Sequence, residues 1–386
     1  MNILSAFKRG KGGSWTATQK QLPTWMQHSI VPHLDAAREY GILAFRPHLS
    51  ACQCHGQGQG GPLTVTFATN GLDRHLKKYL ASLLFTAEPV EKEIGRVPLW
   101  RLGQLINTSK SDLTFIGASK HLLQHLPTRN AILLPRNVDQ MLDVRGDWED
   151  VLKRFHTTVR RNELRLVRKY GYEYELSNRD ADFEIFFHEM YRPSMRTRHG
   201  QQAHLIPYEK AYRTFKNGVL FLVKREGNCV SSGLCDIARE PGVVHFLMEG
   251  VRQGDPQLLK EGAQSTLYYA ITRWANEHGY ETVDFEATEP FLKKGILQHK
   301  RKWGLMVQVK SPKRIWLKIH RSTPAVDQFV QENPCIIIDK QAELQGLFFT
   351  DEPDNVPAET KETWAKLCEM PGMNGYLIRS VKDFLD

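Results

Sequence analysis

The chain has 386 residues, of which 41% are hydrophobic and 25% are charged, a size that predicts two domains and an appendage. The composition is close to that of ordinary globular proteins, which excludes a disordered chain, a collagen-like chain and a disulfide scaffold. No apolar run is long enough to span a bilayer, and residues 1–13 lack the apolar segment of a signal peptide, so we expect a cytoplasmic protein.

The net charge of +9 is concentrated in two segments. Residues 151–169 contain seven Lys or Arg and one acid, Glu163, while residues 290–318 contain nine Lys or Arg and no acid. Such focal basicity is typical of a site for phosphate groups or nucleic acid, and it is also the pattern of a solvated charged surface. The sequence leaves both interpretations open.

A glycine-rich segment, residues 54–61, separates two strand-like runs in the first part of the chain. Its glycines do not have the spacing of a P-loop or of a dinucleotide fingerprint, so we expect a hairpin or a lid. Cys52, Cys54 and His55 are three possible metal ligands. No second cluster follows to complete a tetrahedral set, and we therefore predict no metal.

Alternating strand-like and helical segments predict two successive α/β units joined by a long basic helix over residues 147–170. We expect an N-terminal α/β half over residues 1–146, a C-terminal domain over 147–320, and an extension of unknown role over 321–386. The expected strands lie near residues 41–45, 62–68, 97–102, 112–116, 131–134, 172–176, 219–223, 229–237, 243–251 and 282–285, with two more after Gly304 and a hairpin over 335–349. The expected helices lie near residues 73–84, 180–195, 207–215 and 262–278.

The segment Leu259–Gln264 joins a strand to a helix, and such a junction can hold a pyrophosphate through the N–H groups of the first helical turn. Gly262 would let the backbone come close to a phosphate, and Lys260 would add positive charge. Ala263 and Gln264 would leave the first turn uncluttered. The spacing alone is a weak signal, because many helices begin with glycine.

Three blocks, Gly262–Gly279, Val283–Phe285 and Gly295–Gly304, resemble the carboxyl-terminal GNAT half of Fem-like and BioF2-like (CelD-like) acyltransferases. In that group a helix ends in a small residue plus glycine, a strand carries Asp-Phe, and a Gly-Leu…Phe-Lys-x-x-Phe/Trp-Gly motif closes the unit. The resemblance covers residues 150–310. It implies an α/β fold of tandem GNAT-like halves, with mixed sheets flanked by helices.

The resemblance implies an N-acyltransferase that moves an acyl group, expected to be acetyl, from acyl-CoA to an amine. The amine would belong to a sugar or peptide precursor of a cell-envelope polysaccharide. Acyl-CoA would be a co-substrate bound by residues 260–264, and no metal would be needed. His299 and Glu286 stand where the family has Phe and Gly, which puts the substrate in doubt.

Acyl transfer to an amine needs a proton acceptor. In GNAT-like proteins the strand before the phosphate loop splays from its neighbour; here it is 243–251, and Gly250 is the expected bulge. By strict alternation His245 and Glu249 face the same side, so Glu249 is the first candidate for the general base. Asp284 and Glu286 are expected to share a face of the next strand and are the competing candidates, because a buried pair could raise the pKa of one carboxyl; each acid is equally a candidate salt-bridge partner.

Lys300 matches the motif lysine, which in the Fem-type branch is thought to contact the acyl donor or to stabilise negative charge during transfer. A cationic rim is the structural alternative. Four arginines are candidates for binding an acceptor with phosphates, because guanidinium groups match phosphate geometry, and solvated ion pairs are the alternative for each. These are Arg160, Arg161, Arg196 and Arg198.

Two other functions stay open. A Fem-type aminoacyltransferase that uses aminoacyl-tRNA would have the same fold, with the basic segments binding RNA phosphates. Such ligases often carry a helical arm, and no heptad-rich stretch lies between residues 176 and 310, which favours acyl-CoA as the donor. The third hypothesis is a non-catalytic RNA or polyanion binder, in which aromatic residues near the basic segments stack on bases, although core packing accounts for them as well.

Overall fold

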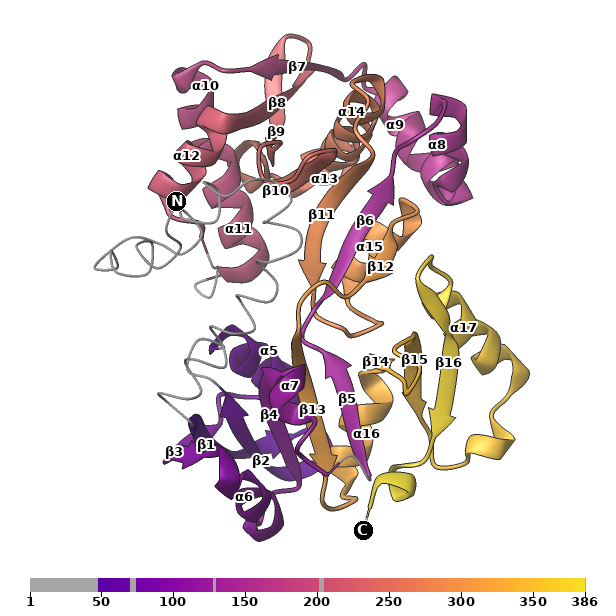
Figure 1. Cartoon of the computed structure of the whole chain (residues 1–386). Coiled ribbons are helices and arrows are strands. Elements are labelled where there is room, and N and C mark those ends of the chain that lie inside the picture. Colours follow the sequence, from indigo (N-terminus) through magenta and orange to yellow (C-terminus); the bar gives the residue numbers. More distant parts are fainter. Residues whose placement is uncertain (1–47, 70–73, 128–129, 201–204, 386) are drawn as a thin grey trace, which may run out of the picture.

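The computed structural model describes residues 48–69, 74–127, 130–200 and 205–385. The chain forms two lobes, each built on one mixed β-sheet with helices packed against it, and a small third sheet lies beside the first lobe (Figure 1). The predicted α/β fold of two mixed-sheet halves flanked by helices is confirmed. The strand expected at residues 41–45 lies outside the described residues. Within the described ranges, no helix is both long and apolar enough to cross a bilayer.

Six strands form the sheet of the first lobe: β1 (His48–Gly58), β2 (Gly61–Thr69), β3 (Val90–Pro98), β4 (Leu113–Ser119), β5 (Ala131–Pro135) and β13 (Lys313–Ile319). Their order is β3-β1-β2-β4-β13-β5, and only the neighbours β2 and β4 are parallel. The glycine-rich segment forms the tip of the β1–β2 hairpin, where Gly58 pairs with Gly61, so the expected hairpin is confirmed. The helices of this lobe are α5 (Arg74–Leu84), α6 (Leu102–Thr108) and α7 (Lys120–Leu123).

Seven strands form the sheet of the second lobe: β6 (Val138–Asp143), β7 (Glu173–Ser177), β8 (Gly218–Arg225), β9 (Asn228–Asp236), β10 (Val243–Val251), β11 (Thr282–Thr288) and β12 (Met306–Gln308). Their order is β12-β6-β11-β10-β9-β8-β7. β10 and β11 are parallel, and the other neighbours are antiparallel.

Eight helices in the described part of the second lobe cover its sheet: α8 (Trp148–Arg154), α9 (Leu164–Lys169), α10 (Asp180–Ile185), α11 (Arg192–His199), α12 (Tyr208–Asn217), α13 (Pro256–Lys260), α14 (Ala263–Glu277) and α15 (Gly295–Lys302). The central one is α14. Leu267, Ile271 and Trp274 recur at helical spacing on its inner face and are buried. This stripe fixes α14 against β8, β9 and β10 and so sets the position of its first turn.

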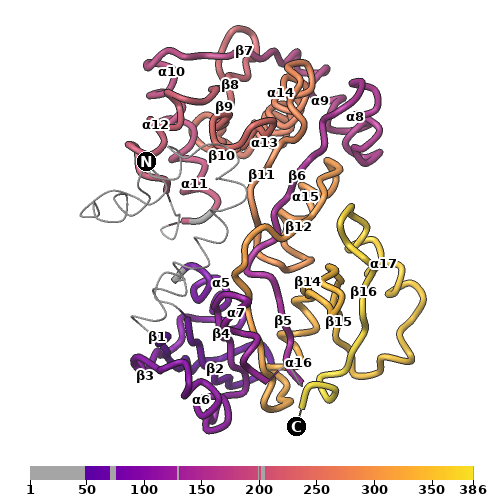
Figure 2. Tube along the Cα trace, in the orientation of Figure 1, coloured from indigo at the N-terminus to yellow at the C-terminus, as the bar shows by residue number. Residues whose placement is uncertain are grey.

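The chain passes between the lobes twice, after β5 and before β13. β6 follows β5 after two residues, yet it pairs with β11 and β12 in the second sheet. β13 follows the second lobe in the sequence, yet it inserts between β4 and β5 in the first sheet. The sheets therefore do not divide the chain at residues 146 and 320, since residues 138–143 belong to the second sheet and residues 313–319 to the first (Figure 2).

The long basic helix expected over residues 147–170 is interrupted. It consists of α8, a π-helical turn (Val159–Glu163) and α9. The N–H of His156 donates to a backbone carbonyl at the end of α15, 2.8 Å away, and the ring of Phe155 packs edge-on against Trp303. The helix breaks here because both the backbone and an apolar side chain bind α15 instead.

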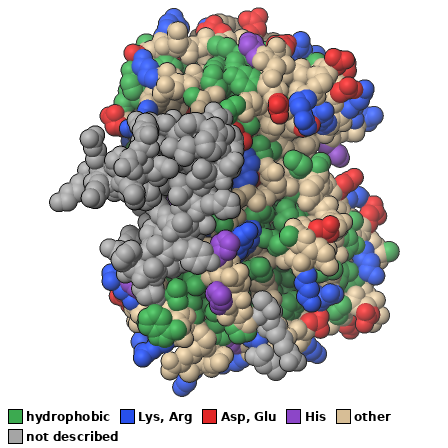
Figure 3. Space-filling view, viewed as in Figure 1, with side chains coloured by type: hydrophobic (Ala, Val, Ile, Leu, Met, Phe, Trp, Pro, Cys, Tyr) green, Lys and Arg blue, Asp and Glu red, His purple; other side chains and the backbone are tan. Residues whose placement is uncertain are grey.

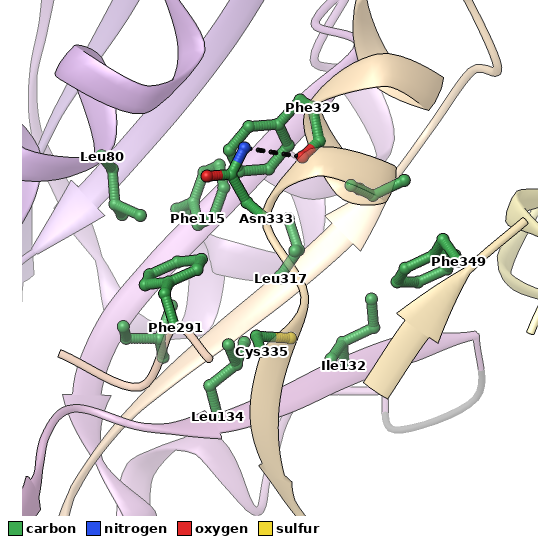
Figure 4. A pocket seen from close by; sticks show the side chains of 12 residues that line it. Leu80, Phe115, Ile132, Leu134, Phe291, Leu317, Phe329, Asn333, Cys335 and Phe349 are labelled. Atoms are coloured by element: carbon green, nitrogen blue, oxygen red, sulfur yellow. Dashed lines mark hydrogen bonds between the residues drawn. The ribbon is translucent and has the colours of Figure 1, made fainter. Parts of the chain in front are cut away.

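The tail forms the third sheet from β14 (Cys335–Ile338), β15 (Leu344–Phe349) and β16 (Met373–Arg379), with helices α16 (Pro324–Glu332) and α17 (Ala358–Cys368). The expected hairpin is confirmed as β14–β15, and β16 adds a parallel strand that was not expected. A small cavity lies where α16 and the tail meet the first sheet, lined by rings and aliphatic groups such as Phe115, Leu317 and Phe349 (Figure 4). It is a gap in the core, and no predicted site residue lines it.

Candidate active site

The parallel strands β10 and β11 separate part of the way along their length. They pair only at Val243–His245 and Thr282–Asp284. Beyond this point β10 stays paired with β9 and β11 continues beside β6. We call the region between Phe246–Val251 and Phe285–Thr288 the wedge. Each strand presents there an edge with no strand partner among the described residues, and such an edge can bind a ligand through its backbone.

A β-bulge at Leu247 determines on which face of the sheet the side chains of β10 lie. Phe246 pairs with Cys235 and Met248 pairs with Leu234, so one extra residue stands on β10. The bulge expected at Gly250 is therefore wrong in position. Because an extra residue reverses the alternation, His245 and Glu249 lie on opposite faces of the sheet, and the expectation that they share a face is wrong as well.

Gly250 has a different role from the one expected. A Cβ at this position would lie 2.4 Å from the backbone of Met190. The glycine therefore lets the π-helical segment that precedes α11 pack directly against β10. That contact places α11, and with it Arg198, beside the wedge.

Glu249 is held on the α14 side of β10 by two contacts to one of its oxygens. Gln264 of α14 donates to Oε1 at 2.6 Å, and Arg198 of α11 donates to the same oxygen at 2.8 Å. Arg198 also donates to the amide oxygen of Gln264, at 3.3 Å. The second carboxylate oxygen, Oε2, is buried and has no hydrogen-bond partner among the described residues.

Lys300 of α15 is buried, and its ammonium group lies against the β11 edge of the wedge. It donates to the carbonyl oxygens of Phe285, at 2.5 Å, and Glu286, at 3.2 Å. An ammonium group has three donors, so one remains. Burial lowers the pKa of Lys300 to about 8, an effect that the nearby carboxylate of Glu249 partly opposes.

Two further side chains at the wedge were missed in the sequence. The ring of Tyr268, from α14, stacks on Phe285 with centroids 4.7 Å apart. The ring of His299 stands edge-on to Tyr268, and its Nε2 has no hydrogen-bond partner in the described part of the chain. Burial lowers the pKa of His299 below its ordinary value, so the imidazole is neutral at pH 7. The one sequence signal for His299 was its departure from the family motif.

The first turn of α14 is covered rather than open. Gly262 has φ of +89°, and a Cβ there would lie 2.9 Å from the Cβ of Leu166 in α9. Glu163 accepts a hydrogen bond from the hydroxyl of Ser265 at 2.5 Å, which places a carboxylate at this helix start. Ala263 is also buried. Of the four residues expected to bind a pyrophosphate, Lys260 alone is exposed, and Gln264 is turned towards Glu249.

The two basic segments differ in the structure. In the first, Arg160 and Arg161 are exposed on the π-helical turn, and Arg196 is exposed on α11. The described face of the molecule in Figure 3 carries cationic and anionic side chains interspersed, with no large patch of one sign. Most of the second segment is committed to internal contacts. These join Lys294 to Glu289, Lys300 to Phe285, Arg301 to the Lys366 carbonyl, Lys310 to Asp284, Arg314 to the Ser311 carbonyl and Lys318 to the Phe384 carbonyl.

Asp284 lies on the face of the sheet opposite Glu249. Its Oδ1 accepts the backbone N–H of Glu286 at 2.8 Å, and its Oδ2 lies 3.3 Å from both Lys310 Nζ and His245 Nδ1. Burial opposes ionisation of this carboxyl, but the contacts with His245 and Lys310 outweigh it and lower the pKa of Asp284 to about 2. The structure therefore brings Glu249, Lys300, Gln264 and Arg198 together at the wedge and sets Asp284 apart.

Comparison with known proteins gives likenesses in structure only. No family model matches the chain, and no curated protein matches it. The structure of FemX is similar to this one over 78% of this chain and 94% of the FemX chain, with 14% sequence identity and a TM-score of 0.37. L-PGS from Bacillus licheniformis is similar over 69% and 83%, with 9% identity and a TM-score of 0.35. A GCN5-related N-acetyltransferase-like protein from Streptococcus suis is similar over 69% and 82%, with 11% identity and a TM-score of 0.27.

Proposed function

We propose that the chain is an N-acyltransferase with its active site in the wedge. In the reaction an amine nitrogen bonds to the carbonyl carbon of an activated acyl carrier, and the bond from that carbon to the sulfur or oxygen of the carrier breaks. The amine loses a proton and the leaving group gains one. An enzyme for this reaction needs a proton acceptor and positive charge near the carbonyl oxygen.

The observation that carries the proposal is the presence of Glu249 and Lys300 in one wedge between diverging strands. Glu249 offers a buried oxygen, Oε2, that no described group occupies, which suits a proton acceptor. Lys300 keeps one N–H after its two backbone contacts, and this donor suits the developing oxyanion. The edge of β10 that has no strand partner among the described residues supplies backbone N–H groups for the acyl carrier.

The donor has two candidates, acyl-CoA and aminoacyl-tRNA. The sequence favours acyl-CoA, whereas the covered start of α14 favours aminoacyl-tRNA. The carboxylate of Glu163 at the first turn repels a pyrophosphate, and Leu166 fills the space above Gly262. Arg160 and Arg161 are exposed on the same turn as Glu163. They suit the phosphates of a large donor that remains on the protein surface.

For the acceptor we propose an amine on a sugar or peptide precursor of a cell-envelope polymer, acylated in the cytoplasm. Arg196 is exposed on α11, on the same helix as Arg198, and suits a phosphate of such a precursor. Arg198 itself is engaged by Glu249 and Gln264, so we assign it to holding Glu249 in place.

The test is calorimetric titration with acetyl-CoA, longer acyl-CoAs and free CoA, and separately with charged and uncharged tRNA, followed by transfer assays to amino sugars and peptides. Saturable acyl-CoA binding that Lys260→Ala weakens supports the first donor. Transfer of a labelled amino acid from tRNA, weakened by Arg160→Ala with Arg161→Ala, supports the second.

Binding of tRNA without any transfer, unchanged when Glu249→Gln and Lys300→Met are combined, would favour a non-catalytic polyanion binder. The absence of binding and transfer with every donor would overturn the proposal.

A further inference from the structure

A second group of ionisable side chains lies on the face of β10 away from Glu249. Its centre is His245, which is 1% exposed. The Nδ1 atom of His245 lies 3.3 Å from Oδ2 of Asp284 and 3.8 Å from Oε1 of Glu286. One ligand atom from each of these residues lies within 4.8 Å of the other two.

The imidazole of His245 is unusual because neither ring nitrogen has a hydrogen-bond partner among the described residues. The 3.3 Å approach to Asp284 is close, but it does not have the alignment of a hydrogen bond. A buried polar atom left unpaired costs about 1–3 kcal/mol, and native proteins rarely carry two on one ring. A ligand that binds Nδ1 would remove this cost at that atom.

We propose that His245, Asp284 and Glu286 bind a divalent transition-metal ion of the Zn²⁺ class, with water completing its coordination. One imidazole nitrogen and two carboxylate oxygens form a donor set that Zn²⁺ accepts. Neighbouring ligands of a tetrahedral ion with bonds of about 2.1 Å are about 3.4 Å apart. The distances of 3.3 and 3.8 Å from Nδ1 lie on either side of this value.

The backbone of β11 is shaped to bring both carboxylates to His245. The strand has an irregularity between Asp284 and Ala287, and Glu286 has φ of +61°, a strained value for a residue with a side chain. A regular strand would keep two alternate side chains about 7 Å apart at their Cα atoms and parallel. The strain turns the carboxylate of Glu286 towards the same point as that of Asp284.

A third acid stands behind the imidazole ring. The Nε2 atom of His245 lies 3.8 Å from Oε2 of Glu240. Metal-binding histidines commonly direct their second nitrogen at a carboxylate, which fixes the tautomer and the ring orientation. Glu240 is therefore the positioning residue for a ligand that binds through Nδ1.

Two cations now contact the oxygens that a metal would take. Lys310 Nζ lies 3.3 Å from Oδ2 of Asp284, and Arg239 lies 3.0 Å from Oε1 of Glu286. Their side chains are 38% and 52% exposed, so both can turn to solvent when a metal ion replaces their charge. They compete with the metal, and removing one should tighten metal binding.

A second group of possible ligands in the described residues provides a matched control. Cys52, Cys54 and Glu91 also place one ligand atom each within 4.8 Å of one another. Lys77 binds Glu91 at 2.6 Å. Thiolates favour softer metals and give a strong charge-transfer absorption with Co²⁺, which imidazole and carboxylates do not.

The experiment is titration of the chelator-stripped full chain with Zn²⁺ by calorimetry and with Co²⁺ by absorption. One ion should bind per chain, without a thiolate charge-transfer band. The isosteric variants Asp284→Asn and Glu286→Gln should each weaken Zn²⁺ binding at least about tenfold. Cys54→Ser should leave it unchanged, and Lys310→Met should tighten it.

Four results would overturn the proposal: no saturable binding, binding that survives both isosteric variants, binding that Cys54→Ser removes, or unchanged affinity in Lys310→Met. Glu286 is half exposed, so Glu286→Gln remains informative if Asp284→Asn fails to fold. Far-ultraviolet circular dichroism and the unfolding temperature of each variant separate a lost ligand from a lost fold.

Discussion

Arg198 of α11 and Glu249 of β10 form an ion pair with 2.8 Å between Nη1 and Oε1, although 51 positions separate them in the sequence. Gln264 donates to the same oxygen. Both of these contacts of Glu249 therefore involve Oε1. The other oxygen, Oε2, is buried and has no hydrogen-bond partner among the described residues. One oxygen of the carboxylate anchors the side chain, and the other is available to accept a proton.

The first prediction concerns this proton acceptor. Glu249→Gln keeps the shape of the side chain but removes its basicity, so kcat for acyl transfer should fall about a hundredfold or more, with little change in donor binding. Steady-state kinetics with the donor identified by titration provide the measurement. Glu277→Gln, an exposed acid at the other end of α14, is the control and should keep wild-type activity. A Glu249→Gln enzyme that retained its kcat would show that another group takes the proton.

The second prediction concerns Arg198. In Arg198→Ala, Glu249 keeps only the Gln264 contact, so the carboxylate should be less well positioned and kcat should fall about tenfold. Arg198→Lys should recover part of the loss, because it restores the positive charge beside Glu249. The recovery should be incomplete, because one ammonium group replaces the paired guanidinium contacts to Glu249 and Gln264. Arg192→Ala, at the start of the same helix, is the control for effects on α11 itself. Equal kcat in Arg198→Ala and wild type would remove Arg198 from the site.

The third prediction concerns pH. Lys300 has a pKa of about 8, so its ammonium form dominates below that pH and is lost above it. Transfer that depends on this charge should decline above about pH 8, and Lys300→Met should be slow at every pH without that decline. The profile is measured with chelator present, so that no metal ion alters the local charge. A wild-type profile that stayed flat to pH 10 would contradict a role for the charged lysine.

The lowered pKa of Lys300 also makes the free energy of unfolding depend on pH. The unfolded chain holds the Lys300 proton up to the ordinary pKa of 10.5, whereas the folded chain releases it at about 8. Between these values the unfolded state binds more protons, so this residue's contribution to the free energy of unfolding rises with pH. Urea unfolding of wild type and Lys300→Met at pH 7.5 and pH 10 should show a more positive change in the free energy of unfolding in wild type than in the variant, because all other titrating groups contribute to both.

The fourth prediction concerns the glycine that ends the motif. Gly304 has φ of +74°, and a Cβ there would lie 2.2 Å from the carbonyl oxygen of Arg154. Gly304→Ala should therefore lower the free energy of unfolding by about 3 kcal/mol or more, because backbone must move. Gly279 has a similar φ of +73°, but no atom of the described residues lies within 4 Å of its Cβ position, and Gly279→Ala should cost about 1 kcal/mol. Similar losses in the two variants would exclude the clash as the cause.

The sequence predicted the features that depend on neighbours in the chain. The apolar stripe of α14 follows from helical spacing, and the hairpins at residues 54–61 and 335–349 follow from strand runs joined by short turns. Glu249 and Lys300 were candidates from strand position and motif, and the structure places both at the wedge. The same local reasoning could not find His299 or Tyr268, because their importance comes from the helices and strands around them.

The failures arose where one residue or a distant partner changes the outcome. Strict alternation put His245 beside Glu249, and the single extra residue at Leu247 separates them. Charge counting treated residues 290–318 as a surface, but the Lys300 and Lys318 side chains are buried and bind backbone carbonyls. A count of charges contains no information on burial.

The return of β13 to the first sheet, after the whole second lobe, has a consequence for how the chain is made. The edges of β4 and β5 that face each other stay open during synthesis until residue 319 has left the ribosome, by which point the whole second lobe has already emerged. Exposed strand edges invite pairing with other chains. Nascent chains that stall before β13 should therefore aggregate or need a chaperone. The first sheet is incomplete without β13, whereas all seven strands of the second sheet lie within residues 138–308.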